Sequence, residues 1–309
     1  MRSRAAPPSA DAVPGGFRDG SGRGPGRFRE RSARALGRSR SLSAAGDVLC
    51  DSVVGIARPY EIGSRLNTIQ ATPTAIRGAP SVNGAKILEN GNTSSKRFMW
   101  HTVDFRSDLP RGWQESLLVF ANDHSQERII TPASVTSRER SAVTAMPVHF
   151  IGGTTVGRGL PWLRDLYYGA FREVAQLACS EPVSPAREVH IGLNMHIQLG
   201  DAERYECHVD SSPLSVLLYV TDHPVGRGGD LVISNRGDVR GRQEVDADAT
   251  RIHPVAGQLV VFDGRHHTHY VAPLKDPDGV RVAVVMPYYT PSCSEGLRPA
   301  DLDHHLGLD

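Results

Sequence analysis

The second half of the sequence consists of a succession of apparent strands. From Val189 to Leu199 apolar residues alternate with polar or small ones, which predicts one long, half-buried strand. Shorter apolar runs follow, separated by turn signals: Gly200-Asp201, Asp222-His-Pro224, Gly226-Arg-Gly-Gly229, Asn235-Arg-Gly237 and Asp276-Pro-Asp-Gly279. Strands that follow one another without intervening helices predict an all-β sandwich or barrel.

Residues 50–186 are predicted to form a mixed α/β front section. Residues 111–121 suggest a short helix, and a better one begins at Pro161, since proline is favoured at the first helical position. Its apolar residues recur at helical spacing: Leu163, Leu166, Tyr167, Ala170, Phe171, Val174 and Ala178. We expect this stripe to pack against the core. Residues 180–185 end the helix.

The N-terminal segment, residues 1–49, is rich in Arg, Gly, Pro and Ser and poor in large apolar residues. Residues 1–40 contain ten Arg and no Lys against three acidic residues, so they carry 10 − 3 = +7. Since the chain carries +1, the remainder carries +1 − 7 = −6. Such a segment buries too little surface to offset its ordering entropy, which predicts disorder. It could be a targeting peptide, a nucleic-acid-binding arm or, as we favour, an extension without function.

The composition is that of an ordinary soluble globular protein, with 39% hydrophobic and 22% charged residues. No apolar run approaches 18 residues, so we expect no membrane span. The four cysteines are scattered without a Cys-x-x-Cys pair, which disfavours a structural zinc site and favours a reducing, cytoplasmic location. Nothing in the acidic body suggests a nucleic-acid-binding face.

One pair of residues has the spacing of metal ligands. His208 and Asp210 are two residues apart, so on a strand both would point to one face with Cα atoms about 6.5 Å apart. A second histidine from another strand would complete a 2-His-1-carboxylate triad, the arrangement of non-haem Fe(II) oxygenases. Three histidines compete for this place: His266, His267 and His269. By alternation His267 shares a face with His269, and His266 does not.

The surroundings of this pair follow a recognisable order. They comprise Pro213 with the run Leu214–Thr221, then Gly228–Leu231, Pro254–Phe262, His269–Pro273 and Val280–Val285. In order and spacing, residues 187–290 resemble the catalytic core of the Fe(II)/2-oxoglutarate-dependent oxygenases, most closely the prolyl-hydroxylase-like branch. The resemblance implies a double-stranded β-helix, or jelly roll, in a mainly β protein with flanking helices. Residues 50–186 would then support and lid the barrel, and residues 291–309 would form a C-terminal appendage.

The same resemblance selects the metal ligands. His269 alone lies in the form His-x-Val-x-Pro-Leu that the family's distal histidine takes, so Fe(II) would bind His208, Asp210 and His269. Relatives that lack the carboxylate have a halide site on iron, so Asp210 favours hydroxylation over chlorination. His190 and His196 lie on the polar side of the predicted long strand, and we expect them at the surface rather than in the pocket.

The co-substrate 2-oxoglutarate needs a cation for its far carboxylate, and Arg281 fits this role. It stands alone in the apolar run Val280–Met286, where a guanidinium is costly unless an anion meets it. The alternative is a salt bridge to a buried acid. Tyr219 resembles the family tyrosine that binds the same carboxylate. Tyr205 matches the recurrent Tyr-x-x-His-x-Asp and would either pack or contact the co-substrate.

The chain departs from the family pattern at two positions of the co-substrate site. Ala283 stands two residues after Arg281, where relatives often carry Ser or Thr, and Gln198 stands about where a tyrosine is usual. Asn194 and Gln198 could supply polar contacts instead. These differences concern the fine geometry of co-substrate binding rather than its identity.

The expected activity is therefore that of a dioxygenase that uses Fe(II), 2-oxoglutarate and O2 and releases succinate and CO2. We expect it to hydroxylate an unactivated C–H bond of a small molecule, an amino acid or a natural-product intermediate, with no nucleic-acid or membrane partner. The length of the front section and the acidic body motivate this choice. One alternative is hydroxylation of a protein side chain, and a remote one is a non-enzymatic binding module of cupin type.

Overall fold

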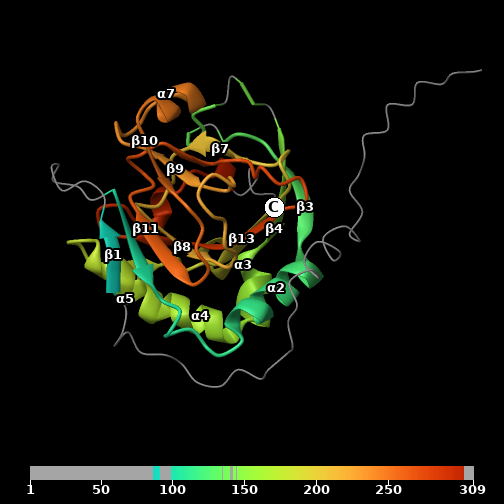
Figure 1. Cartoon of the computed structure of the whole chain (residues 1–309). Helices are drawn as coiled ribbons and strands as arrows, with labels where there is room; N and C mark the ends of the chain where they lie inside the picture. The colour runs from blue at the N-terminus through green and yellow to red at the C-terminus, as the bar shows by residue number, and fades with distance from the viewer. Residues whose placement is uncertain (1–85, 91–98, 134, 140–141, 144, 303–309) are drawn as a thin grey trace, which may run out of the picture. The chain divides into compact units, whose positions relative to one another are not determined.

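The computed structural model describes residues 86–90 and 99–302, except residues 134, 140, 141 and 144 (Figure 1). All of them belong to one compact unit, Gly55–Asp309. The basic N-terminal segment and its predicted disorder lie outside the described residues. Within these residues, no helix combines the length and apolar character that crossing a membrane requires.

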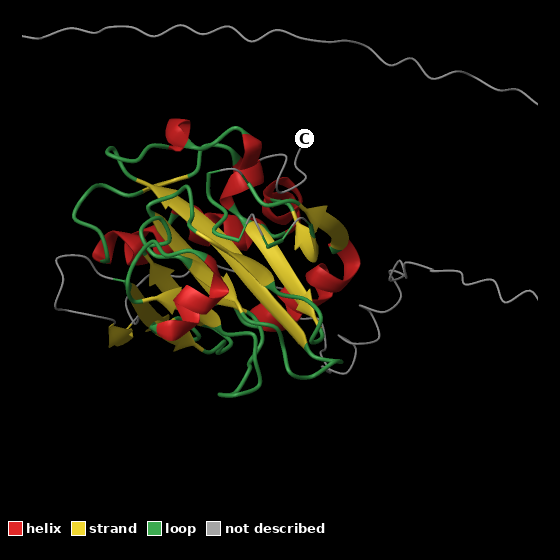
Figure 2. Ribbon diagram, turned by 90° about the horizontal axis from the view of Figure 1, so that it is seen from above, coloured by secondary structure: helices red, strands yellow, loops and turns green. Residues whose placement is uncertain are grey.

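Two antiparallel sheets dominate the fold (Figure 2). The larger sheet contains β1 (Lys86–Asn90), β2 (Trp100–Asp104), β3 (Gln126–Ile130), β4 (Met146–Ile151), β5 (Ser184–Pro185), β6 (Asn194–Leu199), β8 (Leu214–Tyr219), β11 (Gln258–Phe262) and β13 (Val280–Tyr289). The smaller sheet contains β7 (Tyr205–His208), β9 (Leu231–Ser234), β10 (Ala249–Ile252) and β12 (His269–Val271). The helices are α2 (Trp113–His124), α3 (Gly153–Gly159), α4 (Pro161–Tyr168), α5 (Ala170–Leu177), α6 (Val189–Gly192), α7 (Gly241–Ala247) and the short η1 (Glu295–Leu297).

The order of the strands is that of a jelly roll. The larger sheet runs β1-β2-β11-β8-β13-β6-β4-β3, with β5 also beside β13, and the smaller one runs β10-β9-β12-β7. From β6 to β9 and again from β11 to β13, consecutive strands alternate between the two sheets. The chain therefore winds as a double-stranded β-helix, and the predicted fold class, mainly β with flanking helices, is confirmed.

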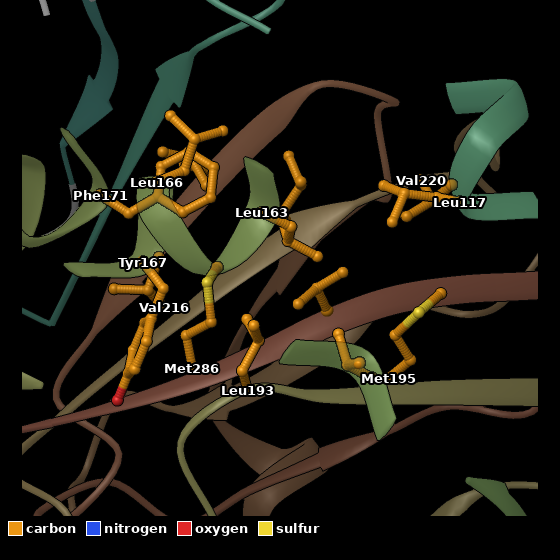
Figure 3. Packing of buried hydrophobic residues seen from close by; sticks show 14 of the residues in the cluster. Leu117, Leu163, Leu166, Tyr167, Phe171, Leu193, Met195, Val216, Val220 and Met286 are labelled. Atoms are coloured by element: carbon orange, nitrogen blue, oxygen red, sulfur yellow. The ribbon is translucent and has the colours of Figure 1, made fainter. Parts of the chain in front are cut away.

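The larger sheet buries both of its faces. On one face α2, α4 and α5 cover side chains such as Val216, Val284 and Met286, as Figure 3 shows for part of this cluster. The other face carries Leu217 and Ala283, which pack with residues of the smaller sheet. A strand buried on both faces is apolar along its whole length, which explains the continuous apolar run of β13. The position of Arg281 in that run is therefore unusual.

The front section contributes to the same sheet as the jelly roll. At one edge β2 pairs with β11, and at the other β4 pairs with β6. The predicted helix at residues 111–121 is α2, and Pro161 is the first residue of α4, as expected. The stripe of apolar residues is buried except for Ala178, which is half-buried just after α5, and Gly169 divides the stripe between α4 and α5. The predicted boundaries at residues 49, 186 and 290 remain predictions.

Two predictions about secondary structure are wrong. The strand expected from Val189 to Leu199 begins at Asn194, because residues 189–192 form the single turn α6. This turn packs closely on α3: a Cβ added to Gly153 would lie 2.0 Å from the carbonyl oxygen of Val189. A helix that the sequence did not suggest, α7, lies between β9 and β10, and its one buried side chain is Val245. A stripe of one residue gives no helical period to detect.

Candidate metal centre and co-substrate site

Two neighbouring strands of the smaller sheet bring three candidate ligands together. His208 ends β7 and His269 begins β12, and the two residues pair directly across the strands. Asp210 follows two residues after His208. Its Oδ1 lies 3.4 Å from Nε2 of His208 and 3.6 Å from Nε2 of His269. Among the described residues, these three form the group of ligand atoms close enough to hold a metal ion, all within 4.8 Å of one another.

Hydrogen bonds to the backbone fix the tautomer of both imidazoles. Nδ1–H of His208 donates to the carbonyl oxygen of Glu206 at 2.8 Å, and Nδ1–H of His269 donates to that of His267 at 3.0 Å. A carbonyl oxygen can only accept, so the proton of each neutral ring lies on Nδ1. Both Nε2 atoms then direct a lone pair toward Asp210. Metal-binding histidines are oriented by this kind of bond, so the geometry fits a metal.

Asp210 is held through both its carboxylate and its backbone. The hydroxyl of Ser215 donates to its Oδ2, and its own backbone N–H donates to the carbonyl oxygen of Gly264 at 2.8 Å. A Cβ added to Gly264 would lie 2.0 Å from Oδ2, so the close approach of this backbone requires glycine. Sequence reasoning missed Ser215 and Gly264 as functional residues. The sequence shows a glycine two residues after Phe262, but it does not show that this glycine lies against Asp210.

The carboxylate of Asp210 and the two imidazole rings shift one another's pKa values. Burial tends to raise the pKa of Asp210, but His269 and His208 outweigh it and hold that pKa well below its usual value. Burial tends to lower the pKa of His208, but Asp210 outweighs it and the net shift is upward. An ionised carboxylate between two imidazoles is the charge pattern that a divalent cation would complete.

The competing histidines lie apart from this group. Nδ1–H of His267 donates to the carbonyl oxygen of Ser234 at 2.9 Å, and His266 interacts with Asp263 at 2.9 Å. The spatial grouping therefore matches the predicted set His208, Asp210 and His269, whose role as ligands we propose below. Asp210 lies beyond the end of β7, so strand alternation did not apply to it as expected.

Arg281 lies on the inner face of the larger sheet with 3% of its surface exposed. Within the described residues no carboxylate forms an ion pair with it, so the alternative of a salt bridge to a buried acid is not observed. Its Nε and the hydroxyl of Tyr219 are both buried, and neither has a hydrogen-bond partner in the described part of the chain. Its guanidinium carbon lies 5.3 Å from the centre of the Tyr219 ring. Burial lowers the pKa of Arg281 and raises that of Tyr219. A buried cation beside an unsatisfied hydroxyl fits one end of a dicarboxylate.

Two cavities lie on this inner face. One of about 160 Å³ contains the three candidate ligands on its wall, and one of about 30 Å³ lies beside Arg281. Tyr205 and His196 line both cavities. His196, expected at the surface, is therefore half-buried and faces the cavities. The ring of Tyr205 lies 5.0 Å from that of His208, so this tyrosine both packs on a candidate ligand and faces the cavities.

Comparison with known proteins agrees with this geometry. Residues 192–289 match the sequence model of the 2OG-Fe(II) oxygenase superfamily. No curated protein matches the chain significantly in sequence.

Similar solved structures include a carbocyclase and two prolyl hydroxylases. The carbocyclase SnoK from nogalamycin biosynthesis is 17% identical over 68% of this chain and 86% of its own, with a TM-score of 0.44. A Trichoplax adhaerens prolyl hydroxylase in complex with a peptide fragment is 15% identical over 62% and 84%, with a TM-score of 0.44. A Pseudomonas putida prolyl-4-hydroxylase is 19% identical over 52% and 77%, with a TM-score of 0.32.

The matched segment contains the two imidazoles, the carboxylate and Arg281 described above. Two imidazoles and one carboxylate are a donor set that suits Fe(II), and the buried guanidinium suits 2-oxoglutarate. Fe(II), 2-oxoglutarate and O2 are the cofactor and co-substrates of this family. Residues 192–289 therefore carry both the sequence pattern and the donor groups of the 2OG-Fe(II) oxygenase superfamily, whose members are oxidoreductases.

Proposed function

We propose that this protein hydroxylates an unactivated C–H bond of a small molecule, with Fe(II) and 2-oxoglutarate. The observation that carries the proposal is the cavity of about 160 Å³ at the candidate metal centre. Its wall away from the triad is largely apolar and includes Ile191, Leu217, Leu231, Phe262 and Val285. A cavity of this size and lining suits an apolar part of a small molecule.

Different residues would bind Fe(II) and 2-oxoglutarate. His208, Asp210 and His269 would hold Fe(II), with Ser215 keeping the carboxylate in place. Arg281 would bind the far carboxylate of 2-oxoglutarate through two parallel hydrogen bonds, and Tyr219 would donate a third. When these groups are bound, they supply the oxidation: one atom of O2 enters succinate, the other enters the substrate C–H bond, and CO2 leaves.

The remaining side chains would position the substrate. The apolar wall excludes water and holds a C–H bond near the metal, so orientation decides which bond reacts. Asp210 fills the position that relatives with a halide site leave open, which supports hydroxylation over halogenation. Tyr205 packs on His208 and limits the space on that side of the cavity.

A second candidate is hydroxylation of a protein side chain. An outer groove of about 720 Å³, formed by residues 184–191 and 289–300, shares Ile191, Tyr289 and Arg298 with the cavity. A groove of this size could take an extended peptide. Of the described front-section residues, only Thr136 lines the inner cavity, and the lid suggested for residues 50–186 remains a prediction.

The test is production of succinate from 2-oxoglutarate in the presence of Fe(II). The protein is assayed alone, with free amino acids and secondary metabolites, and with proline- and lysine-containing peptides. We expect stimulation by small molecules and a hydroxylated product of +16 mass units, the mass of one oxygen atom. Stimulation by peptides alone would refute the small-molecule assignment, and His269→Ala serves as the inactive control.

A further inference from the structure

The cavity at the candidate metal centre has a polar end built partly by the C-terminal residues. Arg298 lies on its wall together with the buried Leu302, and it also lines the outer groove. Ile191 and Tyr289 are shared by the cavity and the groove in the same way. These three residues therefore form the boundary between the cavity and the groove.

The charge of Arg298 acts on the interior at this boundary. Burial raises the pKa of Tyr289 to about 12. Arg298 opposes that rise, whereas Glu295 and Asp210 add to it. The Tyr289 hydroxyl therefore lies in the fields of both the candidate metal centre and Arg298. Among the described residues that line the cavity, Arg298 is the one arginine or lysine. An anionic group of a ligand would be drawn to this end.

Asn194 supplies an unsatisfied acceptor on the wall of the same cavity. Its side chain is 5% exposed and lines the cavity. Its Nδ2 donates to the carbonyl oxygen of Ile191 at 3.1 Å, which fixes the orientation of the amide because that oxygen can only accept. Its Oδ1 is then left buried without a partner among the described residues. A buried acceptor of this kind is costly unless a ligand donates to it.

The two groups are connected through Ile191. Its carbonyl oxygen anchors Asn194, and its side chain lies on the boundary with Arg298. Through Ile191, the acceptor Oδ1 of Asn194 and the cation Arg298 are brought to the same part of the cavity. Apart from the three candidate metal ligands, the rest of the wall is mostly apolar. A carboxylate next to a hydroxyl or an amine, on an apolar body, has the matching pattern.

We propose that the substrate is an apolar 2-hydroxy or 2-amino acid, or a larger molecule that presents such a group. Its carboxylate binds Arg298, and its hydroxyl or amine donates to Oδ1 of Asn194. Its apolar body occupies the wall formed by Leu217, Leu231 and Phe262, beside the triad. This inference rests on the proposed function and names the substrate class of the same site.

The first experiment varies the ligand and leaves the protein unchanged. Full-length protein loaded with Co(II) and 2-oxoglutarate, which does not turn over, is titrated calorimetrically with alanine, valine, leucine and phenylalanine. Their 2-hydroxy analogues, methyl esters and the plain carboxylic acids without the 2-substituent are titrated in parallel. We expect at least one amino or hydroxy acid to bind, with its ester and its plain acid weaker by about tenfold or more, the loss of a hydrogen bond to a charged or buried group.

The second experiment assigns the two contacts. Arg298→Leu should abolish the preference for acid over ester, and Arg298→Lys should restore part of it. Asn194→Ala should abolish the preference for the hydroxy acid over the plain acid. Arg187→Leu, which removes an exposed arginine that lines the outer groove alone, is the matched control and should change neither preference.

The outcomes separate this inference from the proposed function. Succinate formation without substrate should persist in Arg298→Leu, because Arg298 does not line the cavity beside Arg281. If wild-type protein forms succinate but binds none of these acids, or binds ester and acid equally, the substrate class is wrong and the oxygenase assignment stands. If wild-type protein forms no succinate, both the oxygenase assignment and the substrate class are refuted.

Discussion

Replacement of Arg281 by leucine should change the stability of the protein in opposite directions with and without 2-oxoglutarate. In the ligand-free protein Arg281 is 3% exposed, and within the described residues no carboxylate pairs with it. An unsatisfied buried donor costs about 1–3 kcal/mol, and more when charged. The stacking of the guanidinium near the Tyr219 ring returns about 0.5–2 kcal/mol. The cavity of about 30 Å³ beside it has room for roughly one or two waters, which lower the cost further.

The net gain on removing the charge is therefore about 1 kcal/mol in the free energy of unfolding. For a domain of this size, that corresponds to a rise in melting temperature of about 2–4 °C without ligand. With 2-oxoglutarate at 100 times its Kd, wild-type protein should gain about 2.7 kcal/mol. The variant should gain almost nothing, because loss of two charge-assisted bonds of about 1.5–3 kcal/mol each weakens binding more than a hundredfold.

The assay is differential scanning calorimetry of the metal-loaded protein, with and without 2-oxoglutarate and without O2. Arg227→Leu, at an arginine side chain that is 62% exposed, is the matched control and should follow wild type in both conditions. The reasoning is refuted if Arg281→Leu lowers the melting temperature of the ligand-free protein and still shows the full stabilisation by 2-oxoglutarate. That pair of results would mean that Arg281 has a structural partner and does not bind the co-substrate.

Three further predictions concern the metal centre and the N-terminal segment. His269→Ala should lose Fe(II) binding in equilibrium dialysis, whereas His267→Ala should retain it; the reverse result would show that the wrong histidine was chosen. Ser215→Ala removes the hydroxyl that orients Asp210 and should weaken metal affinity by about 10–100-fold, the usual cost of losing such a partner; unchanged affinity in a metal titration would argue against this role. Deletion of residues 1–45 should leave activity and melting temperature nearly unchanged, and a large loss of either would show that this segment contributes to the fold or the site.

The parts of the site that the sequence revealed are those with a local signature. His208 and Asp210 are recognisable because they are two positions apart, and His269 because of the residues that follow it. Arg281 stands out because a charge interrupts an apolar strand. In each case the informative neighbours lie within a few positions along the chain, so a single sequence contains the signal.

The parts that the sequence missed depend on contacts between distant segments. Ser215 is one of many serines until the fold places it on Asp210, and Arg298 lies in a C-terminal stretch without a recognised motif. The alternation at residues 189–192 fits a strand as well as the turn that forms. In the structure this turn packs closely on Gly153, a contact that the local pattern does not reveal. Tertiary contacts override local pattern in such short stretches.

The central claim is that one Fe(II) binds His208, Asp210 and His269 and that 2-oxoglutarate then binds beside it. The most direct test is anaerobic titration of the full-length protein with Fe(II) and 2-oxoglutarate, followed by the visible charge-transfer absorption of the chelate. The account predicts one iron per chain and a band that saturates with 2-oxoglutarate in wild type but is absent in His208→Ala and His269→Ala. A band of full intensity in either variant, or no band in folded wild-type protein that has bound iron, would contradict it.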